Sequence, residues 1–384
     1  MSKKNQSFQA SILIFFFYAS AGTLLQFFYL LFRAKGFSIG PISFLLLIPN
    51  FFILFAGPIW ASVADIFNIH KRILFIAMVF SIPSIILLSY STTYIGTLIT
   101  FSIFAINFAP LLTMTDNSVL DVLGNDKSKF GRIRLWGAVS FGLTAWVIGI
   151  LADDFGIEIA YWIGAVCMVV AAISTFYLTP STPIQQEPYW KNLQIFMGNK
   201  IWLIFLLGIL LAGYGQSMLT GYFSAYLLDL GATNSLIGLS IYISTLSEIP
   251  IMLFSPFLLK RFSPQKLILI SIIALVIRYL GCIQFIDFIP LIATQALHGF
   301  TSALFWISAI IYTRNLAPIK LKASALAILG AVYYGLGGVL GNLLGGQIYA
   351  NFGARMMFIS GAITASIGLG IFLLIKKKPR SKEF

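Results

Sequence analysis

Charged residues are scarce in this chain, and their scarcity excludes a soluble globular protein. Only 10% of the 384 residues are charged, 59% are hydrophobic, and the mean hydropathy is +0.93. A soluble domain carries roughly 25% charged residues. Uncharged runs long enough for the ~20 residues of a membrane-spanning helix lie at 5–32, 36–64, 159–186, 201–228 and 323–354. The composition therefore predicts an all-α polytopic membrane protein.

Residues for metal, nucleotide or redox chemistry are also few. The chain has 2 cysteines, Cys167 and Cys282, and both lie in apolar runs typical of core packing. The 2 histidines, His70 and His298, belong to no cluster with metal-ligand spacing. No Walker A motif is present, so we expect no ATP hydrolysis by this chain. The pattern predicts no metal, no cofactor and no enzyme activity.

The hydrophobic runs divide into twelve expected helices, and the basic residues indicate their orientation. Placing both termini in the cytoplasm puts most of the 25 Lys and Arg on that side, as the positive-inside rule requires. The net charge of +13 then reflects topology and contact with anionic lipid rather than nucleic acid. We expect a multi-pass protein of the cytoplasmic (inner) membrane. The expected helices are 8–32, 39–64, 72–90, 94–122, 132–152, 157–178, 201–228, 236–259, 267–285, 290–314, 323–349 and 354–375.

A weak internal repeat divides the chain into two similar halves. FRAKGFSIGPIS aligns with LLDLGATNSLIG, which places Gly36 opposite Gly231, and Lys71 falls opposite Lys266. Two unrelated membrane hairpins would share some of this likeness, but the repeated glycine turn favours a true repeat. We expect an amino-terminal six-helix bundle at 1–178, a linker at 179–200 and a carboxy-terminal bundle at 201–384. Glycines 337, 341 and 345 should form a close-packing helix face.

The segment GPIWASVADIFNIHKR, residues 57–72, carries an acid followed by a basic pair. Together with the two six-helix halves, it resembles the major facilitator superfamily, whose loop after the second helix has a glycine, an aspartate and a basic cluster. Asp65, Lys71 and Arg72 match that loop, which implies a gating role in this family. Ala61 and Asn68 replace its glycines, and a solvated loop with topogenic charges is the alternative.

The segment 116–141, DNSVLDVLGNDKSKFGRIRLWGAVSF, resembles the lactose permease and its oligosaccharide and phenylpropionate relatives. In those families a carboxylate with the spacing of Asp116 pairs with an arginine at the position of Arg134 and binds substrate. An arginine fork suits a polar solute. Trp136 and Phe141 would supply aromatic faces for a ring.

Three polar residues lie at one expected depth in successive helices of the second half: Glu248, Arg278 and His298. They lie roughly 15–18 Å from their helix starts, near the middle of a ~30 Å hydrocarbon core. Taken singly, Glu248 and Arg278 would neutralise each other and His298 would be a buried imidazole; together they resemble the proton-coupling network of the same families. Thr301 and Gln295 stand where lactose permease has charged residues, which puts lactose-type coupling in question.

The sequence thus favours a secondary active transporter that moves a small polar organic solute, such as a sugar, nucleoside or aromatic acid, with protons in symport. An uncoupled facilitator, an exporter and a non-transporting solute sensor are the alternatives. We expect a monomer in the lipid bilayer whose cavity is lined by helices 1, 4, 7 and 10. Its further polar lining residues should be Asn107, Gln26, Gln216 and Gln295.

Overall fold

The computed structural model describes residues 3–67, 69–123, 130–178, 199–317 and 321–375, and these residues form helices joined by short turns. No strand occurs among them. Nine helical segments in these ranges are long and apolar enough to cross a membrane, while Tyr94–Phe108 and Ile159–Thr175 are apolar but shorter. The all-helical membrane architecture is confirmed, and the count of twelve crossings stays a prediction.

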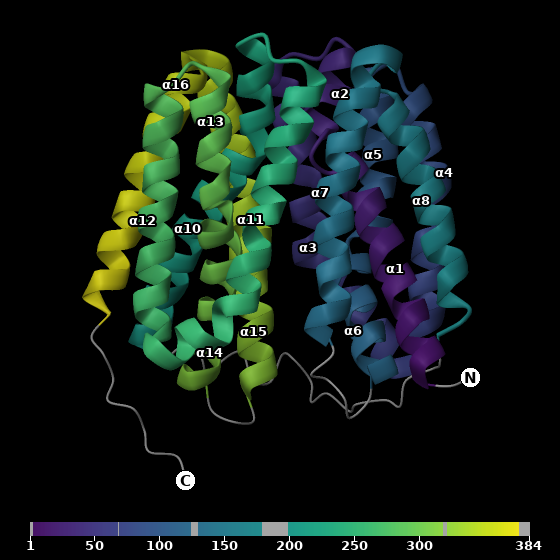
Figure 1. Cartoon of the computed structure of the whole chain (residues 1–384), viewed down its shortest axis with the longest axis horizontal. Helices are drawn as coiled ribbons and strands as arrows, with labels where there is room; N and C mark the ends of the chain where they lie inside the picture. The colour runs from purple at the N-terminus through teal and green to yellow at the C-terminus, as the bar shows by residue number, and fades with distance from the viewer. Residues whose placement is uncertain (1–2, 68, 124–129, 179–198, 318–320, 376–384) are drawn as a thin grey trace.

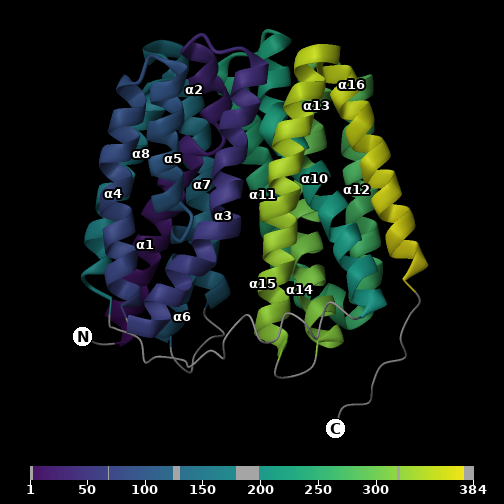
Figure 2. The same ribbon diagram turned by 180° about the vertical axis from the view of Figure 1, so that it is seen from behind.

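Helices of the first and second halves of the chain lie on opposite sides of the molecule (Figures 1 and 2). The first half contains α1 (Lys3–Leu24), α2 (Phe28–Ala34), α3 (Ile39–Phe67), α4 (His70–Tyr90), α5 (Tyr94–Phe108), α6 (Leu111–Leu123), α7 (Phe130–Phe155) and α8 (Ile159–Thr175). The second half contains α10 (Lys200–Asp229), α11 (Asn234–Arg261), α12 (Pro264–Gln284), α13 (Phe288–Thr294), α14 (Phe305–Leu316), α15 (Lys322–Gly330) and α16 (Gly338–Leu374). The expected linker falls almost wholly outside the described residues.

Several expected continuous helices are interrupted in the structure. The run 8–32 breaks at residues 25–27, between α1 and α2, and the run 94–122 breaks at Ala109 and Pro110, between α5 and α6. The run 290–314 contains a 3₁₀ turn (Gln295–Leu297) and a π-helical turn (Phe300–Leu304), and a second π-helical segment (Ala331–Gly337) joins α15 to α16. Proline explains the break at Pro110, because it has no N–H to donate and clashes with the preceding turn.

Matching glycine turns support the internal repeat. Gly36 and Gly231 have φ of 85° and 87°, a left-handed conformation that glycine adopts without steric cost. Each amide bonds back to the carbonyl three residues earlier, Arg33 or Leu228, and the next amide to the carbonyl five residues back. This pairing is a Schellman motif. The same helix ending therefore occurs at equivalent places in the two halves.

The glycine face on α16 packs as expected, against α10. A Cβ built on Gly337 would lie 3.0 Å from backbone atoms of Gly213, and one on Gly345 would meet the Met218 side chain. Gly341 likewise faces Tyr214 and Met218. Small residues thus let the two helix backbones approach closely.

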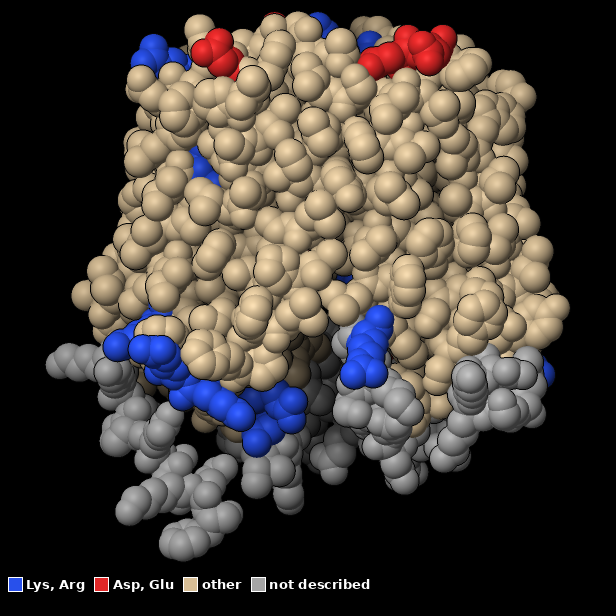
Figure 3. Space-filling view, in the orientation of Figure 1, with Lys and Arg blue, Asp and Glu red and all other residues tan. Residues whose placement is uncertain are grey.

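Contacts between the two halves gather at the end opposite to the start of α1 (Figure 1). There the Asp153 carboxylate of α7 accepts hydrogen bonds from the backbone amides of Asn234 (2.8 Å) and Ser235 (3.1 Å), at the start of α11. On the other side of this end, Gln347 of α16 donates to Ser43 of α3 at 3.0 Å. Toward the start of α1 the ribbons of the two halves diverge (Figure 2). Lys and Arg side chains gather at that diverging end (Figure 3).

Candidate functional site

A carboxylate and a guanidinium meet on the inner side of the first half. Asp116 of α6 and Arg134 of α7 approach to 3.4 Å between Oδ1 and Nε, and their side chains stay 32% and 28% exposed. The Arg134 guanidinium also lies 4.0 Å from the ring centroid of Tyr18 on α1. The expected pair forms, but through one contact rather than a two-pronged fork. Donors of Arg134 therefore remain available to a ligand.

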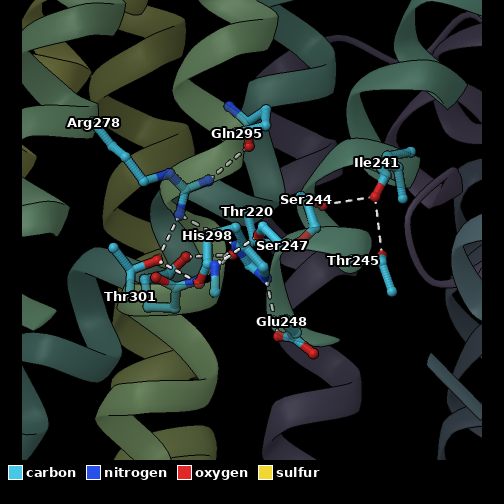
Figure 4. Close-up of polar contacts among 12 residues, drawn as sticks. Thr220, Ile241, Ser244, Thr245, Ser247, Glu248, Arg278, Gln295, His298 and Thr301 are labelled. Carbon is cyan, nitrogen blue, oxygen red and sulfur yellow. Dashed lines mark hydrogen bonds and ion pairs between the residues drawn. The ribbon is translucent and has the colours of Figure 1, made fainter. Parts of the chain in front are cut away.

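The second half supplies its own acid and imidazole. Glu248 of α11 lies 3.4 Å from His298, measured from Oε1 to Nε2. The other ring nitrogen of His298, Nδ1, lies 3.2 Å from Arg278 Nη1 (Figure 4). It also lies 3.5 Å from Gln216 Nε2. Both of these neighbours are N–H donors, so Nδ1 must accept. Nε2 then carries the proton and points it toward Glu248.

Arg278 of α12 is buried among neutral acceptors. Its guanidinium donates to Gln295 Oε1 at 2.7 Å and to Thr301 Oγ1 at 2.8 Å (Figure 4). The expected direct neutralisation by Glu248 is wrong, because the carboxylate contacts His298 instead. His298 lies between the 3₁₀ turn (Gln295–Leu297) and the π-helical turn (Phe300–Leu304), and its imidazole contacts both Glu248 and Arg278. A buried charge of this kind is costly unless hydrogen-bonded on several sides.

The charged side chains of the first half lie near those of the second half, in the middle of the molecule. Arg134 of the first half and Glu248 of the second are close enough for an electrostatic interaction, and Tyr334 interacts with both. Two arginines and two carboxylates thus surround this region with His298 neutral. The charges balance, so a neutral solute could enter without leaving an unmatched charge in the membrane.

Four other predicted lining residues take different positions. Trp136 is 52% exposed and packs beside Phe15, on the side of α7 away from Arg134. Asn107 donates to Ile103 O of its own helix at 2.8 Å. Gln26 lies in the break between α1 and α2, and Phe141 is half-buried two turns along α7 from Arg134. The structure gives none of these four a contact with the charged residues.

Gln216 and Gln295 do join the charged network. Gln216 contacts His298, and its Oε1 is buried without a hydrogen-bond partner. Gln295 accepts a hydrogen bond from Arg278. Buried acceptors without donors are uncommon. The Gln216 oxygen therefore suits a ligand that brings a hydroxyl or N–H donor.

The predicted gating residues lie far from this network. Lys71 donates to the carbonyls of Phe176 (3.0 Å) and Leu178 (2.6 Å), just beyond the end of α8. A lysine suits that position because it satisfies carbonyls at the negative end of the helix. Arg72 is exposed. Asp65 lies in the last turn of α3, and its side chain is outside the described residues.

Two residues of the site carried no signal in the sequence. Tyr18 ends an aromatic run, Phe15 to Phe17, and only its contact with Arg134 distinguishes it. Tyr334 lies in the glycine-rich segment that we expected to serve helix packing alone. Both reach the site through contacts between distant parts of the chain. Among the described residues, no group of three or more His, Cys, Asp or Glu side chains could hold a metal ion.

Known proteins resemble this chain over nearly its whole length. The "uncharacterized transporter YwbF" of Bacillus subtilis (strain 168) is 25% identical, covering 90% of this chain and 85% of that protein. Maltose permease of Geobacillus stearothermophilus is 24% identical, covering 91% and 88%. The crystal structure of the nucleoside transporter NupG shares the fold, with a TM-score of 0.85 at 20% identity, over 97% of this chain and 100% of that one.

The family assignment follows from the sequence itself. The model of the MFS_1 like family matches residues 8–360. The relatives named above are membrane transporters and not enzymes. This chain is a multi-pass membrane protein and belongs to the MFS_1 like family of major facilitator solute transporters.

Proposed function

We propose that this protein is a secondary active transporter that moves a small polar organic solute with protons, by alternating access, across the cytoplasmic membrane. It works as a monomer of two bundles, residues 1–178 and 201–384, with both termini in the cytoplasm. The basic residues at the diverging end of the molecule support that orientation (Figure 3). In this orientation the contacts of Asp153 close the outer end, and the site opens inward.

The observation that carries the proposal is that each half holds an acid with a basic partner: Asp116 lies 3.4 Å from Arg134 in the first half, and Glu248 lies 3.4 Å from His298 in the second. The two pairs belong to different halves, so a rocking motion of one half against the other changes their separation. The electrostatic energy between the pairs then depends on the conformational state, on the solute bound near Arg134 and on the proton bound by Glu248. Such mutual dependence is the physical requirement for coupling two ligands.

The solute is best described by what it must donate. Gln216 Oε1 is an acceptor without a donor, and Arg134 contacts Asp116 through its Nε. A sugar or nucleoside has hydroxyl groups that can donate to the Gln216 oxygen and accept from the arginine. The relatives named for maltose and for nucleosides have solutes of this type. The carboxylate of an aromatic acid would satisfy Arg134 but would leave the Gln216 acceptor unmatched.

Glu248 is the proposed proton carrier. His298 points its Nε2 proton at this carboxylate, and it cannot accept a second proton on Nδ1 while Arg278 donates there. Protonation of Glu248 would instead remove one negative charge from the region between the two halves. Proton binding on Glu248 thereby leaves the positive charge of Arg134 less balanced and strengthens its attraction for acceptor groups of the solute.

An uncoupled facilitator is the second candidate, and Thr301 is the observation that favours it. Thr301 supplies a neutral hydroxyl to Arg278, where lactose permease has a carboxylate that takes part in proton movement. In a facilitator, Glu248 would only balance charge. Transport would then follow the solute gradient alone.

Uptake into proteoliposomes separates these functions. The purified protein is reconstituted and offered tritiated maltose or uridine, with and without an inward proton gradient. Accumulation above the outside concentration, only with the gradient, is expected of a symporter. Equilibration without accumulation indicates a facilitator, and binding without uptake indicates a solute sensor.

A further inference from the structure

Tyr334, which lies near the charged residues, packs against a second aromatic side chain, and neither has been given a role above. Tyr334, in the π-helical segment Ala331–Gly337, lies edge-on to Trp306 of α14, with ring centroids 4.8 Å apart. Tyr333 packs against both rings at 4.8 Å and 5.4 Å and is itself buried. The buried Tyr333 ring therefore packs against both of the other rings and helps to hold them in place.

The exposed face of Tyr334 lines the space between the two halves. The residue is 42% exposed, which in a membrane protein could mean contact with lipid. However, the segment that carries Tyr334 packs against α3 of the first half, where Cβ atoms built on Gly335 and Gly338 would meet Leu54 and Asn50. Tyr334 thus lies on a segment between the two halves, near enough to Glu248 and Arg134 to be influenced by both charges. Its free surface therefore belongs to the inner space of the site.

The backbone around Tyr334 holds the ring in place. A Cβ built on Gly335 would lie 3.0 Å from Leu54 of α3, and one on Gly337 would lie 3.0 Å from Gly213 of α10. Tight packing on both sides limits movement of this segment in the observed state. π-Helical turns are frequent at functional sites. Here the turn positions Tyr334 toward the charged residues.

We propose that Tyr334 and Trp306 form an aromatic wall that binds the ring of the solute, while Asp116 and Arg134 bind its polar groups. This inference rests on the proposed transport function and narrows its substrate to ring-bearing neutral solutes, with acyclic polyols excluded. A flat aromatic face suits the C–H face of a sugar or the face of a nucleobase. Rigid aromatic rings supply this contact area at a small cost in conformational entropy.

Binding to the purified full-length protein tests the wall. Uridine and maltose are the ring-bearing probes and sorbitol is the acyclic one, each titrated by calorimetry. Tyr334→Ala should weaken binding of the ring-bearing probe by about tenfold or more, the order found when an aromatic ring that stacks on a base is removed. Tyr334→Phe keeps the ring and should stay within about threefold. Trp306→Leu should behave as Tyr334→Ala does.

The matched control is Tyr90→Ala. Tyr90 is 69% exposed and lies edge-on to Trp162 at 6.1 Å, a similar aromatic pair at the end of α4. It should leave affinity unchanged. Should Tyr334→Ala fail to fold, Tyr334→Leu keeps most of the volume without the flat face, and the same loss of affinity is expected.

Different results would contradict the aromatic wall and the proposed transport function. Unchanged affinity in Tyr334→Ala or Tyr334→Leu, with affinity lost in Asp116→Asn, would overturn the wall and leave the charged site standing. Binding of sorbitol as tight as that of uridine or maltose would overturn it too. If the wild-type protein neither binds nor takes up any of these solutes, the wall and the transport of such solutes are both overturned.

Discussion

Glu248 and Arg278 are linked through His298, because one ring nitrogen contacts the carboxylate and the other contacts the guanidinium. The carboxylate lies 3.4 Å from Nε2 and the guanidinium 3.2 Å from Nδ1. The imidazole therefore transmits the state of Glu248 to a buried cation that the carboxylate does not touch. A change of charge on Glu248 alters the balance across two helices at once.

Replacing Glu248 by Gln should abolish pH-driven accumulation while leaving solute exchange largely intact. The amide keeps an oxygen that accepts from His298 but cannot carry a proton. Counterflow and gradient-driven uptake are measured in the same proteoliposomes. The control is Glu158→Gln, an exposed carboxylate just before α8. Accumulation that survives in Glu248→Gln would show that another group carries the proton, and loss of exchange as well would indicate a structural role.

Asp116→Asn and Arg134→Lys should each weaken solute binding by about tenfold, or ~1.4 kcal/mol. Asparagine loses the charge that holds Arg134. Lysine lacks the planar group that lies over the Tyr18 ring and donates in two directions. Calorimetry measures affinity, with Asp287→Asn and Arg355→Lys as exposed controls. Two site variants that bind as the wild type does would remove Asp116 and Arg134 from the proposed site.

Asp153→Ala should shift the protein toward the state that is open at its outer end. The variant loses the acceptor for two amides at the start of α11, and loss of a helix cap costs about 0.5–2 kcal/mol. Spin labels on cysteines at exposed Phe155 and Phe352 report the separation of the halves. Cys167 and Cys282 are buried, which protects them from labelling. The control is Asp154→Ala, at the exposed neighbouring residue, which should leave the distances between the labels unchanged. Equal distance distributions in the two variants would show that the contact of Asp153 with α11 does not hold the outer end closed.

Gln295→Leu should lower stability by about 1.5–3 kcal/mol, the range for a hydrogen bond to a charged group. The change removes the acceptor that lies 2.7 Å from Arg278 Nη2 and leaves that donor buried without a partner. Unfolding in detergent is followed at fixed pH. The comparison is Gln284→Leu, the same substitution at the exposed end of α12. Equal stability of both variants would mean that Arg278 finds another acceptor.

The grouping of three polar residues could be predicted from the sequence, whereas the direction of each side chain around its helix could not. Glu248, Arg278 and His298 were expected at one level and are found in one network, because rise per residue is nearly constant along a helix. The contact of Glu248 with His298 was not predicted, because the sequence does not show how side chains are oriented by the 3₁₀ and π turns near His298. Asp116 and Arg134 were found through family resemblance, which preserves the outcome of such packing.

Aromatic residues show the same difference. Trp136 follows Arg134 by two positions, close in sequence, yet on a helix it points to the far side. Tyr18 and Tyr334 come from distant segments and approach Arg134 through tertiary packing. Proximity in the chain was therefore a poor guide to the lining of the site. Only the arrangement of both halves reveals it.

The tight crossing of α7 and α11 near the outer end offers a way to hold the protein in one state. A Cβ built on Gly238 would lie 2.7 Å from the carbonyl oxygen of Ala145 and 3.1 Å from Gly149. A single methyl group there would clash in the observed state, and we expect a state in which α7 and α11 separate to relieve that clash. Because a difference of ~1.4 kcal/mol changes a two-state ratio tenfold, Gly238→Ala would enrich the outward-open form. Such a preparation would serve as the antigen for selecting conformation-specific antibody fragments.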